Sequence, residues 1–326
     1  MKVGIAGAGF MGEVHAECYA KLNGVQLWGV AEKSQERMDK FVTKFAPKKT
    51  YSDVFDMIAD EEIDVIDICL PSPMHPAVAI EALKQNKHVL LEKPIALNLD
   101  DALKIKQAAE VSRGKFMVAH VLRFWPQYTV IRKSLQDQLL GQQIQEIYAS
   151  RFNELPLWSE GTWIMEEKQS GGLVIDLMIH DIDFVMWNLG KVNRVWCKGI
   201  YNENDFAIQV MAVLEMKSGA VCYIEGGYLN PSGSGLSSQM RIYGSDGLLE
   251  MYSHQDKIKL VETGGGQKEL NVPSMDGYFE EIAYFVDCIR QGREPEVVTA
   301  QDAIESLKVC LGLRDSLKRG TWIAID

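Results

Sequence analysis

The N-terminal stretch constrains the fold most strongly, because a short apolar run passes directly into a glycine-rich turn. Residues 2–6 are mostly apolar, and the run Gly7-Ala8-Gly9-Phe10-Met11-Gly12 follows them. Glycines at this spacing allow a tight turn, close approach of the backbone to a pyrophosphate, and close packing of a helix on the strand. The pattern predicts a helix over residues 11–22 whose N-terminal N–H groups bind phosphate. The predicted cofactor contacts are Gly7, Gly9, Phe10, Met11 and Gly12.

The second apolar run indicates which dinucleotide would bind. Residues 25–31 end at Glu32, which lies about 20 residues beyond Gly12. An acid at this place accepts hydrogen bonds from the ribose hydroxyls of NAD and repels a 2′-phosphate, so NAD is predicted and NADP is less favoured. Lys33 follows directly and works against that preference. The alternative is that Glu32 is an ordinary acidic residue at a helix entry.

Apolar runs continue to alternate with helical patterns through the first third of the chain. Strands are expected at residues 49–51, 65–70, 88–92 and 116–120, and Ser34 and Asn98 are expected to cap helices. This alternation predicts an α/β fold with a doubly wound parallel sheet, forming an NAD-binding domain over residues 1–121.

Two of these strands end at residues whose side chains could bind a ligand or take part in a reaction. In open parallel sheets, ligands bind outside the carboxyl ends of the strands. Pro71 and His75 follow one such strand, and Glu92 and Lys93 end the next before Pro94, so all four are predicted to lie near the cofactor. Two alternatives stay open: His75 is a turn residue without a role, and Lys93 is a salt-bridged surface lysine.

The pattern changes after residue 121 and predicts a second domain over residues 122–326. Residues 154–170 have little periodicity and contain Trp158 and Trp163, as a functional loop would. Six β patterns follow between residues 194 and 261, with turns at 217–219 and 245–247 that predict hairpins. We expect a large, open, mostly antiparallel sheet with helices on one face. Its other face would need covering, which predicts a homodimer or homotetramer formed through this sheet.

The predicted helix over residues 173–189 carries a polar group on an apolar background. Asp176, His180 and Asp183 have the spacing of a single helical face, and most of their neighbours are apolar. Buried polar side chains must pair or meet a ligand. Three interpretations are open: an internal Asp–His pair, a histidine base with an acid beside it, or a metal site. No metal is expected, because no further histidine or cysteine cluster accompanies the helix.

Composition excludes several classes of partner. The chain has 34 basic and 45 acidic residues, a net charge of −11, which argues against binding to nucleic acid or to an anionic membrane surface. No apolar run is long enough to span a bilayer, and no signal peptide is expected. The six cysteines are scattered, as in reduced thiols of a cytoplasmic protein.

Taken together, these motifs resemble the glucose–fructose oxidoreductase / inositol dehydrogenase / rhizopine catabolism (Gfo/Idh/MocA) family of oxidoreductases over essentially the whole chain. The carriers are the glycine turn, Glu92-Lys93-Pro94, Arg123-Phe124-Trp125-Pro126, Gly171-Gly172 and the Asp176-x3-His180 helix. The resemblance implies catalytic roles for Lys93, Asp176 and His180, and a sugar, polyol or cyclitol substrate. Many members have aspartate where this chain has Glu32. Candidates for the substrate pocket are Arg123, Asn153, Trp158, Trp163 and Tyr278.

The resulting hypothesis is reversible hydride transfer between a carbinol carbon and a nicotinamide. His180 would act as general base and Lys93 would stabilise negative charge on the reacting oxygen, while Asp176 would hold His180 or bind a neighbouring hydroxyl. Which of Lys93 and His180 takes the proton directly is left open. Two other classes fit the same fold: a regulatory protein that senses NAD, and a glycosidase that oxidises its substrate transiently.

Overall fold

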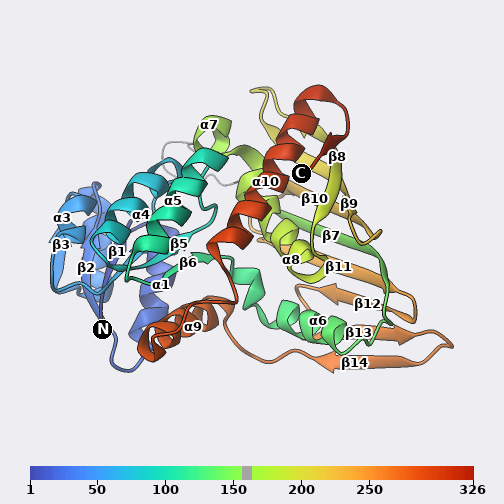
Figure 1. The fold of residues 1–326 in the computed structure, drawn as a ribbon, viewed down its shortest axis with the longest axis horizontal. Coiled ribbons are helices and arrows are strands. Elements are labelled where there is room, and N and C mark those ends of the chain that lie inside the picture. The colour runs from blue at the N-terminus through green and yellow to red at the C-terminus, as the bar shows by residue number, and fades with distance from the viewer. Residues whose placement is uncertain (156–163) are drawn as a thin grey trace. The chain divides into compact units, whose positions relative to one another are not determined.

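The computed structural model describes residues 1–155 and 164–326, and the chain forms two compact units (Figure 1). The first unit comprises Met1–Phe124 and Asp276–Ile304, and the second comprises Trp125–Met275 and Glu305–Asp326. The stretch from Asp276 belongs to the first unit because its helix α9 (Gly277–Gln291) packs against helix α1 (Phe10–Ala20). The domain boundary that the sequence suggests, between residues 121 and 122, stays a prediction.

A six-stranded parallel sheet organises the first unit. Its order is β3-β2-β1-β4-β5-β6, the strand order of a doubly wound dinucleotide-binding sheet, as predicted. The order reverses between β1 and β4, and ligands bind at such a switch point in open sheets. The strands are β1 (Lys2–Ala6), β2 (Gln26–Ala31), β3 (Lys49–Tyr51), β4 (Val65–Ile68), β5 (His88–Glu92) and β6 (Phe116–Ala119).

The helices of the first unit begin where local chemistry satisfies their free N–H groups. Ser34 accepts a hydrogen bond from the Arg37 N–H, and Asn98 accepts one from the Asp101 N–H, so both predicted caps are confirmed. Asp53 caps the short helix that follows it by accepting a hydrogen bond from the Phe55 N–H. Besides α1 and α9, the helices are α2 (Gln35–Phe45), α3 (Val54–Ile58), α4 (His75–Lys84) and α5 (Leu99–Val111), with 3₁₀ turns at Ser72–Met74 and Val121–Arg123.

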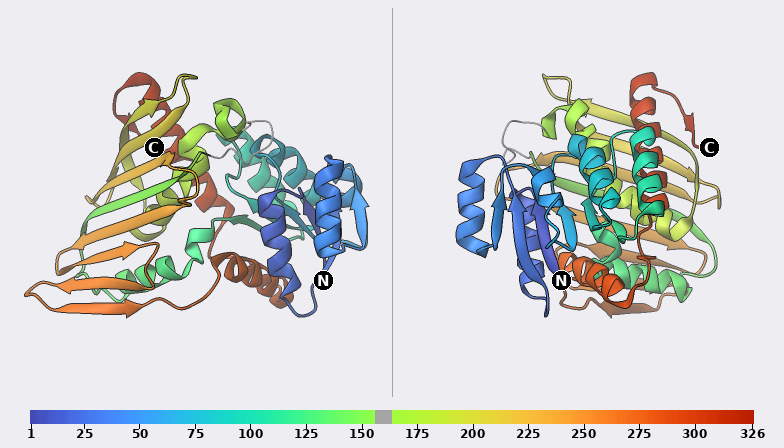
Figure 2. Two further views of the ribbon diagram at one scale, coloured as in Figure 1. Left: turned by 180° about the vertical axis from the view of Figure 1, so that it is seen from behind. Right: turned by 60° about the vertical axis from the view of Figure 1, so that its left-hand side comes forward.

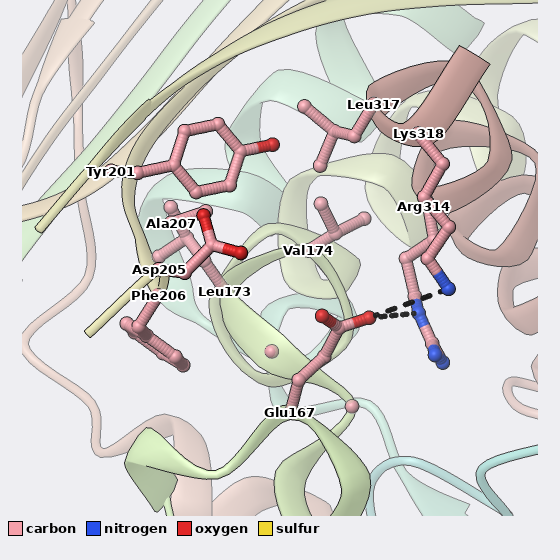
Figure 3. Close-up of a pocket in the computed structure, with 12 residues that line it drawn as sticks. Glu167, Leu173, Val174, Tyr201, Asp205, Phe206, Ala207, Arg314, Leu317 and Lys318 are labelled. Carbon is pink, nitrogen blue, oxygen red and sulfur yellow. Dashed lines mark hydrogen bonds and ion pairs between the residues drawn. The ribbon is translucent and has the colours of Figure 1, made fainter.

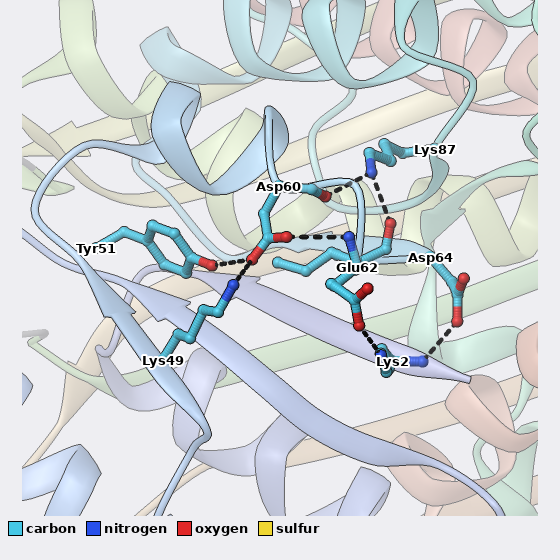
Figure 4. Close-up of polar contacts among 8 residues, drawn as sticks. Lys2, Lys49, Tyr51, Asp60, Glu62, Asp64 and Lys87 are labelled. Carbon is cyan, nitrogen blue, oxygen red and sulfur yellow. Dashed lines mark hydrogen bonds and ion pairs between the residues drawn. The ribbon is translucent and has the colours of Figure 1, made fainter.

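Paired charges cover the amino ends of these parallel strands (Figure 4). The Asp60 carboxylate accepts hydrogen bonds from Lys49 Nζ at 2.7 Å and from the Tyr51 hydroxyl at 2.5 Å. These hydrogen bonds, from Lys49 first and then Tyr51, hold the pKa of Asp60 well below its usual range. Lys87 Nζ donates to the main-chain carbonyls of Asp60 at 2.8 Å and Ile63 at 2.7 Å. The amino edge of the sheet is therefore occupied by internal polar contacts.

A nine-stranded sheet organises the second unit, in the order β14-β13-β12-β11-β7-β10-β9-β8-β15. Only β7 and β10 pair in parallel, so the predicted large and mostly antiparallel sheet is confirmed, together with both hairpins. The strands are β7 (Ile144–Glu154), β8 (Val192–Tyr201), β9 (Ala207–Met216), β10 (Val221–Asn230), β11 (Ser237–Gly244), β12 (Gly247–Tyr252), β13 (Lys257–Glu262), β14 (Gln267–Asn271) and β15 (Ile323–Ala324).

Helices cover one face of this sheet (Figure 2). Helix α8 (Ile179–Leu189) packs on β7 and β10, and the second half of α10 (Ala300–Arg319) contacts β8, where Ser316 Oγ accepts a hydrogen bond from the Cys197 N–H. Helix α6 (Pro126–Gln136) packs on α8. The short helix α7 (Glu167–Ser170) precedes α8 in the sequence. Side chains on the covered face are buried, as a half-covered sheet requires.

All six cysteines are free, and all but the partly exposed Cys69 are buried. Among the described residues, no helix has both the length and the apolar character that crossing a bilayer requires.

A buried ion pair joins β7 to α8 beneath the second sheet. Arg151 Nε lies 2.7 Å from one oxygen of Asp181, and Arg151 Nη2 lies 3.0 Å from the other. The same Nη2 donates to the Tyr128 hydroxyl at 2.8 Å. Both charged side chains are almost fully buried, so each depends on the other for its charge to be tolerated.

Replacing Arg151 with methionine should therefore be strongly destabilising. The change leaves the Asp181 carboxylate buried without its cation, at a cost of about 3–5 kcal/mol in the free energy of unfolding. Arg194→Met is the matched control, because the Arg194–Glu215 pair is exposed to solvent and should contribute little. Urea unfolding followed by circular dichroism measures both variants; equal midpoints would contradict the role given to the buried pair.

Candidate active site

The glycine turn after β1 is built by close contacts that leave no room for side chains. Gly7 has a φ of 98°, and a Cβ on it would lie 2.5 Å from the Cys69 carbonyl oxygen. A Cβ on Gly12 would lie 2.0 Å from the Gly7 carbonyl oxygen. Gly9 differs, because a Cβ placed on it would have Arg37 Nη1 as its nearest neighbour, at 4.0 Å. The fold itself thus requires Gly7 and Gly12, whereas the space beside Gly9 is open to a ligand. Phe10, the first residue of α1, is 63% exposed, and Met11 follows it.

Glu32 is fixed at the end of β2 by main-chain donors. One carboxylate oxygen accepts the Ala8 N–H at 3.0 Å and the other accepts the Ser34 N–H at 2.9 Å. An ionised carboxylate has further lone pairs, so both oxygens can still accept ribose hydroxyls. Arg37 Nε lies 3.9 Å from Glu32, and this cation beside the predicted ribose position was missed from the sequence.

The loop after β4 has a structural role that its sequence did not reveal. Pro71 precedes the 3₁₀ turn, and His75 begins α4 with only 1% of its surface exposed. The two ring nitrogens of His75 each lie 2.8 Å from a main-chain carbonyl oxygen, those of Pro94 and Leu70. Burial lowers the pKa of His75 despite these contacts. The side chain therefore ties the loop to the segment after β5, and its predicted contact with the cofactor stays a prediction.

The end of β5 places Glu92 inward and leaves Lys93 partly exposed. The Glu92 side chain is 8% exposed, and its Oε2 accepts the Lys93 main-chain N–H at 3.1 Å. The Lys93–Pro94 peptide bond is cis, and Lys93 is the partly exposed residue between buried neighbours on either side. Glu92 thus supports the Lys93 main chain from the interior, and its predicted contact with the cofactor stays a prediction.

The predicted helix in the second unit begins with a π-helical turn, Val174–Met178, before α8. Such turns occur frequently at functional sites. From Gly171 to Val185, Asp176 and His180 are the two side chains that are not buried. Asp183, which the spacing grouped with them, is fully buried and accepts a hydrogen bond from Ser306 Oγ at 2.9 Å. Asp183 therefore belongs to the core.

A tyrosine that the sequence did not single out contacts Asp176. The Tyr228 hydroxyl, from β10, donates to Asp176 Oδ2 at 2.5 Å. Burial, followed by the nearby charge of Asp176, raises the pKa of Tyr228 well above its ordinary value, so its hydroxyl stays a donor. The Tyr228 ring stacks on Phe206 with centroids 6.4 Å apart. The Asp176 carboxylate is therefore held in one orientation.

The remaining predicted pocket residues have varied settings. Arg123 is 3% exposed, donates to the Val297 carbonyl at 2.7 Å and lies 3.3 Å from Asp302, so its guanidinium is engaged within the first unit. Asn153 Oδ1 accepts the N–H of the next residue at 2.9 Å. Trp158 and Trp163 lie outside the described residues.

Tyr278 lies near the start of α9, and its ring centroid is 6.5 Å from that of His15. This contact places it against α1 within the first unit. Its predicted contact with substrate stays a prediction.

A cavity of about 270 Å³ opens beside the π-helical turn of the second unit (Figure 3). Leu173 and Val174 form one wall, and Glu167 pairs with Arg314 at 3.1 Å within it. The described residues that line it include neither Asp176 nor His180. The cavity is therefore separate from the predicted acid–base pair.

Two glycine variants separate the structural and ligand-binding roles of the turn. Gly9→Ala should leave the thermal midpoint of the apoprotein nearly unchanged, because Gly9 has a φ of −80° and open space beside it. NAD should bind about tenfold or more weakly, since the methyl group occupies the space of the pyrophosphate. Gly12→Ala should lower both the midpoint and the affinity, because its methyl group meets main chain. Calorimetry measures both quantities, and unchanged NAD affinity in Gly9→Ala would contradict this assignment.

Comparison with known proteins agrees with this geometry. Residues 1–120 match the family described as "Oxidoreductase family, NAD-binding Rossmann fold", and residues 128–250 match the GFO/IDH/MocA C-terminal domain. A myo-inositol 2-dehydrogenase of Thermotoga maritima is 24% identical, with 100% of this chain and 99% of the relative covered. A scyllo-inositol 2-dehydrogenase (NAD(+)) of Bacillus subtilis is 23% identical, with 100% and 96% covered.

A solved structure shares the fold over the whole chain. It is a levoglucosan dehydrogenase in complex with NADH and levoglucosan, with a TM-score of 0.89 and 20% identity, covering 100% of this chain and 99% of that one. The two domain matches together span most of the sequence, and the first has the glycine turn and strand order of a dinucleotide-binding fold. The chain belongs to the GFO/IDH/MocA family of oxidoreductases and has its NAD-binding Rossmann fold.

Proposed function

We propose that this chain is an NAD-dependent dehydrogenase that oxidises or reduces a hydroxyl-bearing carbon of a sugar, polyol or cyclitol. The observation that carries the proposal is the setting of Asp176 and His180, the two side chains that are not buried between Gly171 and Val185. The inositol and levoglucosan dehydrogenases among its relatives favour this substrate class. A ring with several hydroxyls would suit a carboxylate and an imidazole that lie one helical turn apart.

The first unit would hold the cofactor. The N–H groups at the start of α1 would bind its pyrophosphate, and the Glu32 carboxylate would accept its ribose hydroxyls. Bound NAD would supply the hydride acceptor for oxidation of the carbinol carbon. Arg37 beside Glu32 tempers the repulsion of a 2′-phosphate, so we expect a preference for NAD rather than exclusion of NADP.

The proton of the reacting hydroxyl is the part of the chemistry that falls to the protein. His180 takes this proton as general base. Lys93 donates a charged hydrogen bond to the oxygen as negative charge develops on it. Asp176, whose carboxylate Tyr228 holds at 2.5 Å, orients His180 or a neighbouring substrate hydroxyl. The two acids next to His180 in the core, Asp181 and Asp183, are engaged by Arg151 and Ser306 and take no part.

We further propose that the chain is a homodimer or homotetramer formed through the open face of the nine-stranded sheet. On β9 and β10, buried side chains alternate with exposed ones, as in a sheet covered on one face only. Met211 is 50% exposed and Tyr223 is 43% exposed, and both lie on strands at the centre of the sheet. Apolar side chains gathered on an open face are typical of association surfaces. The free and mostly buried cysteines also favour a cytoplasmic enzyme.

The enzymatic proposal is tested with a panel of cyclitols, aldoses and nucleotide sugars, with NAD reduction read by absorbance. With a substrate identified, His180→Ala should lower kcat by about 10²–10⁴-fold while NAD affinity is retained. Lys93→Met should cause a comparable loss, because it removes the charge beside the reacting oxygen. His254→Ala is the matched control, since His254 is exposed on the second unit and should keep full activity.

Three outcomes would overturn the proposal. A folded His180→Ala enzyme with wild-type kcat would return this helix to a purely structural role. Substrate turnover without net NADH would instead indicate a glycosidase that oxidises its substrate transiently, and NAD binding without turnover would indicate a sensor.

Association is tested by introducing a charge on the open face. Tyr223→Glu should lower the mass measured by sedimentation velocity, because a carboxylate would have to be buried in the interface. Leu103→Glu is the control: Leu103 is 44% exposed, close to the 43% of Tyr223, but it lies on α5 of the first unit. A wild-type chain that sediments only as a monomer would contradict the proposal.

A further inference from the structure

A buried network of three polar side chains, the His15 network, lies in the first unit beneath the end of β5. His15 lies on α1, Asp67 on β4 and Glu92 at the end of β5. His15 Nδ1 is 2.9 Å from Asp67 Oδ2, and His15 Nε2 is 3.3 Å from Glu92 Oε1. His15 and Asp67 are fully buried, and Glu92 is 8% exposed. One imidazole therefore bridges two carboxylates inside the sheet–helix core.

The charges of the side chains in the His15 network depend on one another. Burial alone would lower the pKa of His15, but the charge of Asp67, with Cys69 and their hydrogen bonds, raises it well above its ordinary value. Burial would raise the pKa of Glu92, but the interaction with His15, 3.3 Å away, lowers it. A cationic His15 between two carboxylates is thus the arrangement in which both buried acids are compensated. Tyr19, on α1, lies beside Asp67, and the Tyr278 ring, on α9, has its centroid 6.5 Å from that of His15.

These residues do not form a convincing metal site. The ligand atoms of His15, Asp67 and Cys69 lie within 4.8 Å of one another. Each is already engaged, because His15 Nδ1 pairs with Asp67, and the Cys69 thiol donates to Asp67 Oδ1 at 3.4 Å. Burial and the charge of Asp67 raise the pKa of the Cys69 thiol, which disfavours the thiolate that a metal would bind.

The His15 network contacts the main chain of Lys93 through Glu92. Glu92 Oε1 faces His15, while its other oxygen accepts the Lys93 N–H at 3.1 Å. On the far side of Lys93, the Pro94 carbonyl oxygen lies 2.8 Å from His75 Nδ1. The backbone from which the lysine side chain extends is thus held by buried groups both before and after it. Side chains of this kind set the geometry of residues that act on a ligand.

We propose that His15 is a positioning residue for Lys93, because it fixes the Glu92 carboxylate that holds the Lys93 main chain. The role of Lys93 in turnover rests on the proposed function. The positioning itself is a property of the first unit and can be measured without a substrate.

The test uses the full chain with bound NAD in four variants. His15→Gln removes the cation, and Glu92→Gln removes its carboxylate partner while keeping a side chain of similar shape. The double variant combines them, and His88→Gln is the matched control. His88 lies at the opposite end of the same strand, where its Nδ1 accepts the Lys115 N–H at 3.0 Å. Glu92→Gln also serves if His15→Gln folds poorly.

Two readouts separate positioning from general stability. The first is the Lys93 amide signal and its hydrogen exchange, observed by NMR after labelling lysines with ¹⁵N and assigned with Lys93→Arg. Exchange should accelerate by about tenfold or more in His15→Gln and Glu92→Gln, and stay unchanged in His88→Gln. The second is steady-state kinetics: kcat should fall about 10–100-fold, with KM changed by less than about threefold. The double variant should be no worse than either single variant.

Several results would overturn the inference. An unchanged Lys93 amide in both single variants would show that the His15 network does not hold it. Wild-type kcat in folded His15→Gln, or losses that multiply in the double variant, would show that His15 and Glu92 act separately. If the amide responds as expected but no substrate in the panel is turned over, the positioning stands and the proposed function fails.

Discussion

The contact between Gly12 and the Gly7 carbonyl is the constraint on which the first unit depends. A Cβ at Gly12 would lie 2.0 Å from that oxygen, so only glycine lets α1 begin this close to β1. The close approach has two consequences. The N–H groups at the start of α1 are left available to a phosphate, and His15, one turn along, lies among the carboxylates of β4 and β5. Cofactor binding and the support of Lys93 thus follow from one packing contact.

The amino and carboxyl ends of the parallel strands carry different kinds of polar side chain. Toward the amino ends, polar side chains bind one another, as Lys49 and Tyr51 do when both donate to Asp60. At the carboxyl ends, Glu32 and Lys93 retain partial exposure and the ability to bind a ligand. Residues directly beneath them, such as Glu92, are buried and paired. The exposed polar side chains at the carboxyl ends of the strands are thus supported from below by polar groups that are almost fully buried.

Local signals accounted for what the sequence could predict. Glycine spacing, the Ser34 and Asn98 caps, and the alternation of apolar runs depend on neighbours in the chain, and they identified the Rossmann sheet and the antiparallel sheet correctly. The contacts between His15 and Glu92, and between Tyr228 and Asp176, join residues far apart in the sequence. No periodicity reveals such pairs. The same limit explains why the sequence does not reveal the contacts by which His75 and Glu92, both at strand ends, brace the main chain around Lys93.

The polar helix of the second unit shows most clearly where spacing stops being informative. It carries Asp176, His180, Asp181 and Asp183 within eight residues, and the spacing of Asp176, His180 and Asp183 predicts a single polar face. The π-helical turn shifts the register, and each side chain then meets a different neighbour: Arg151 for Asp181, Ser306 for Asp183 and Tyr228 for Asp176. Burying a charge is tolerated only with such a partner, so the two core acids are explained by stability alone. Asp176 and His180 keep partial exposure on a helix whose other positions nearby are closed to solvent, and that exposure is the observation on which their proposed role rests.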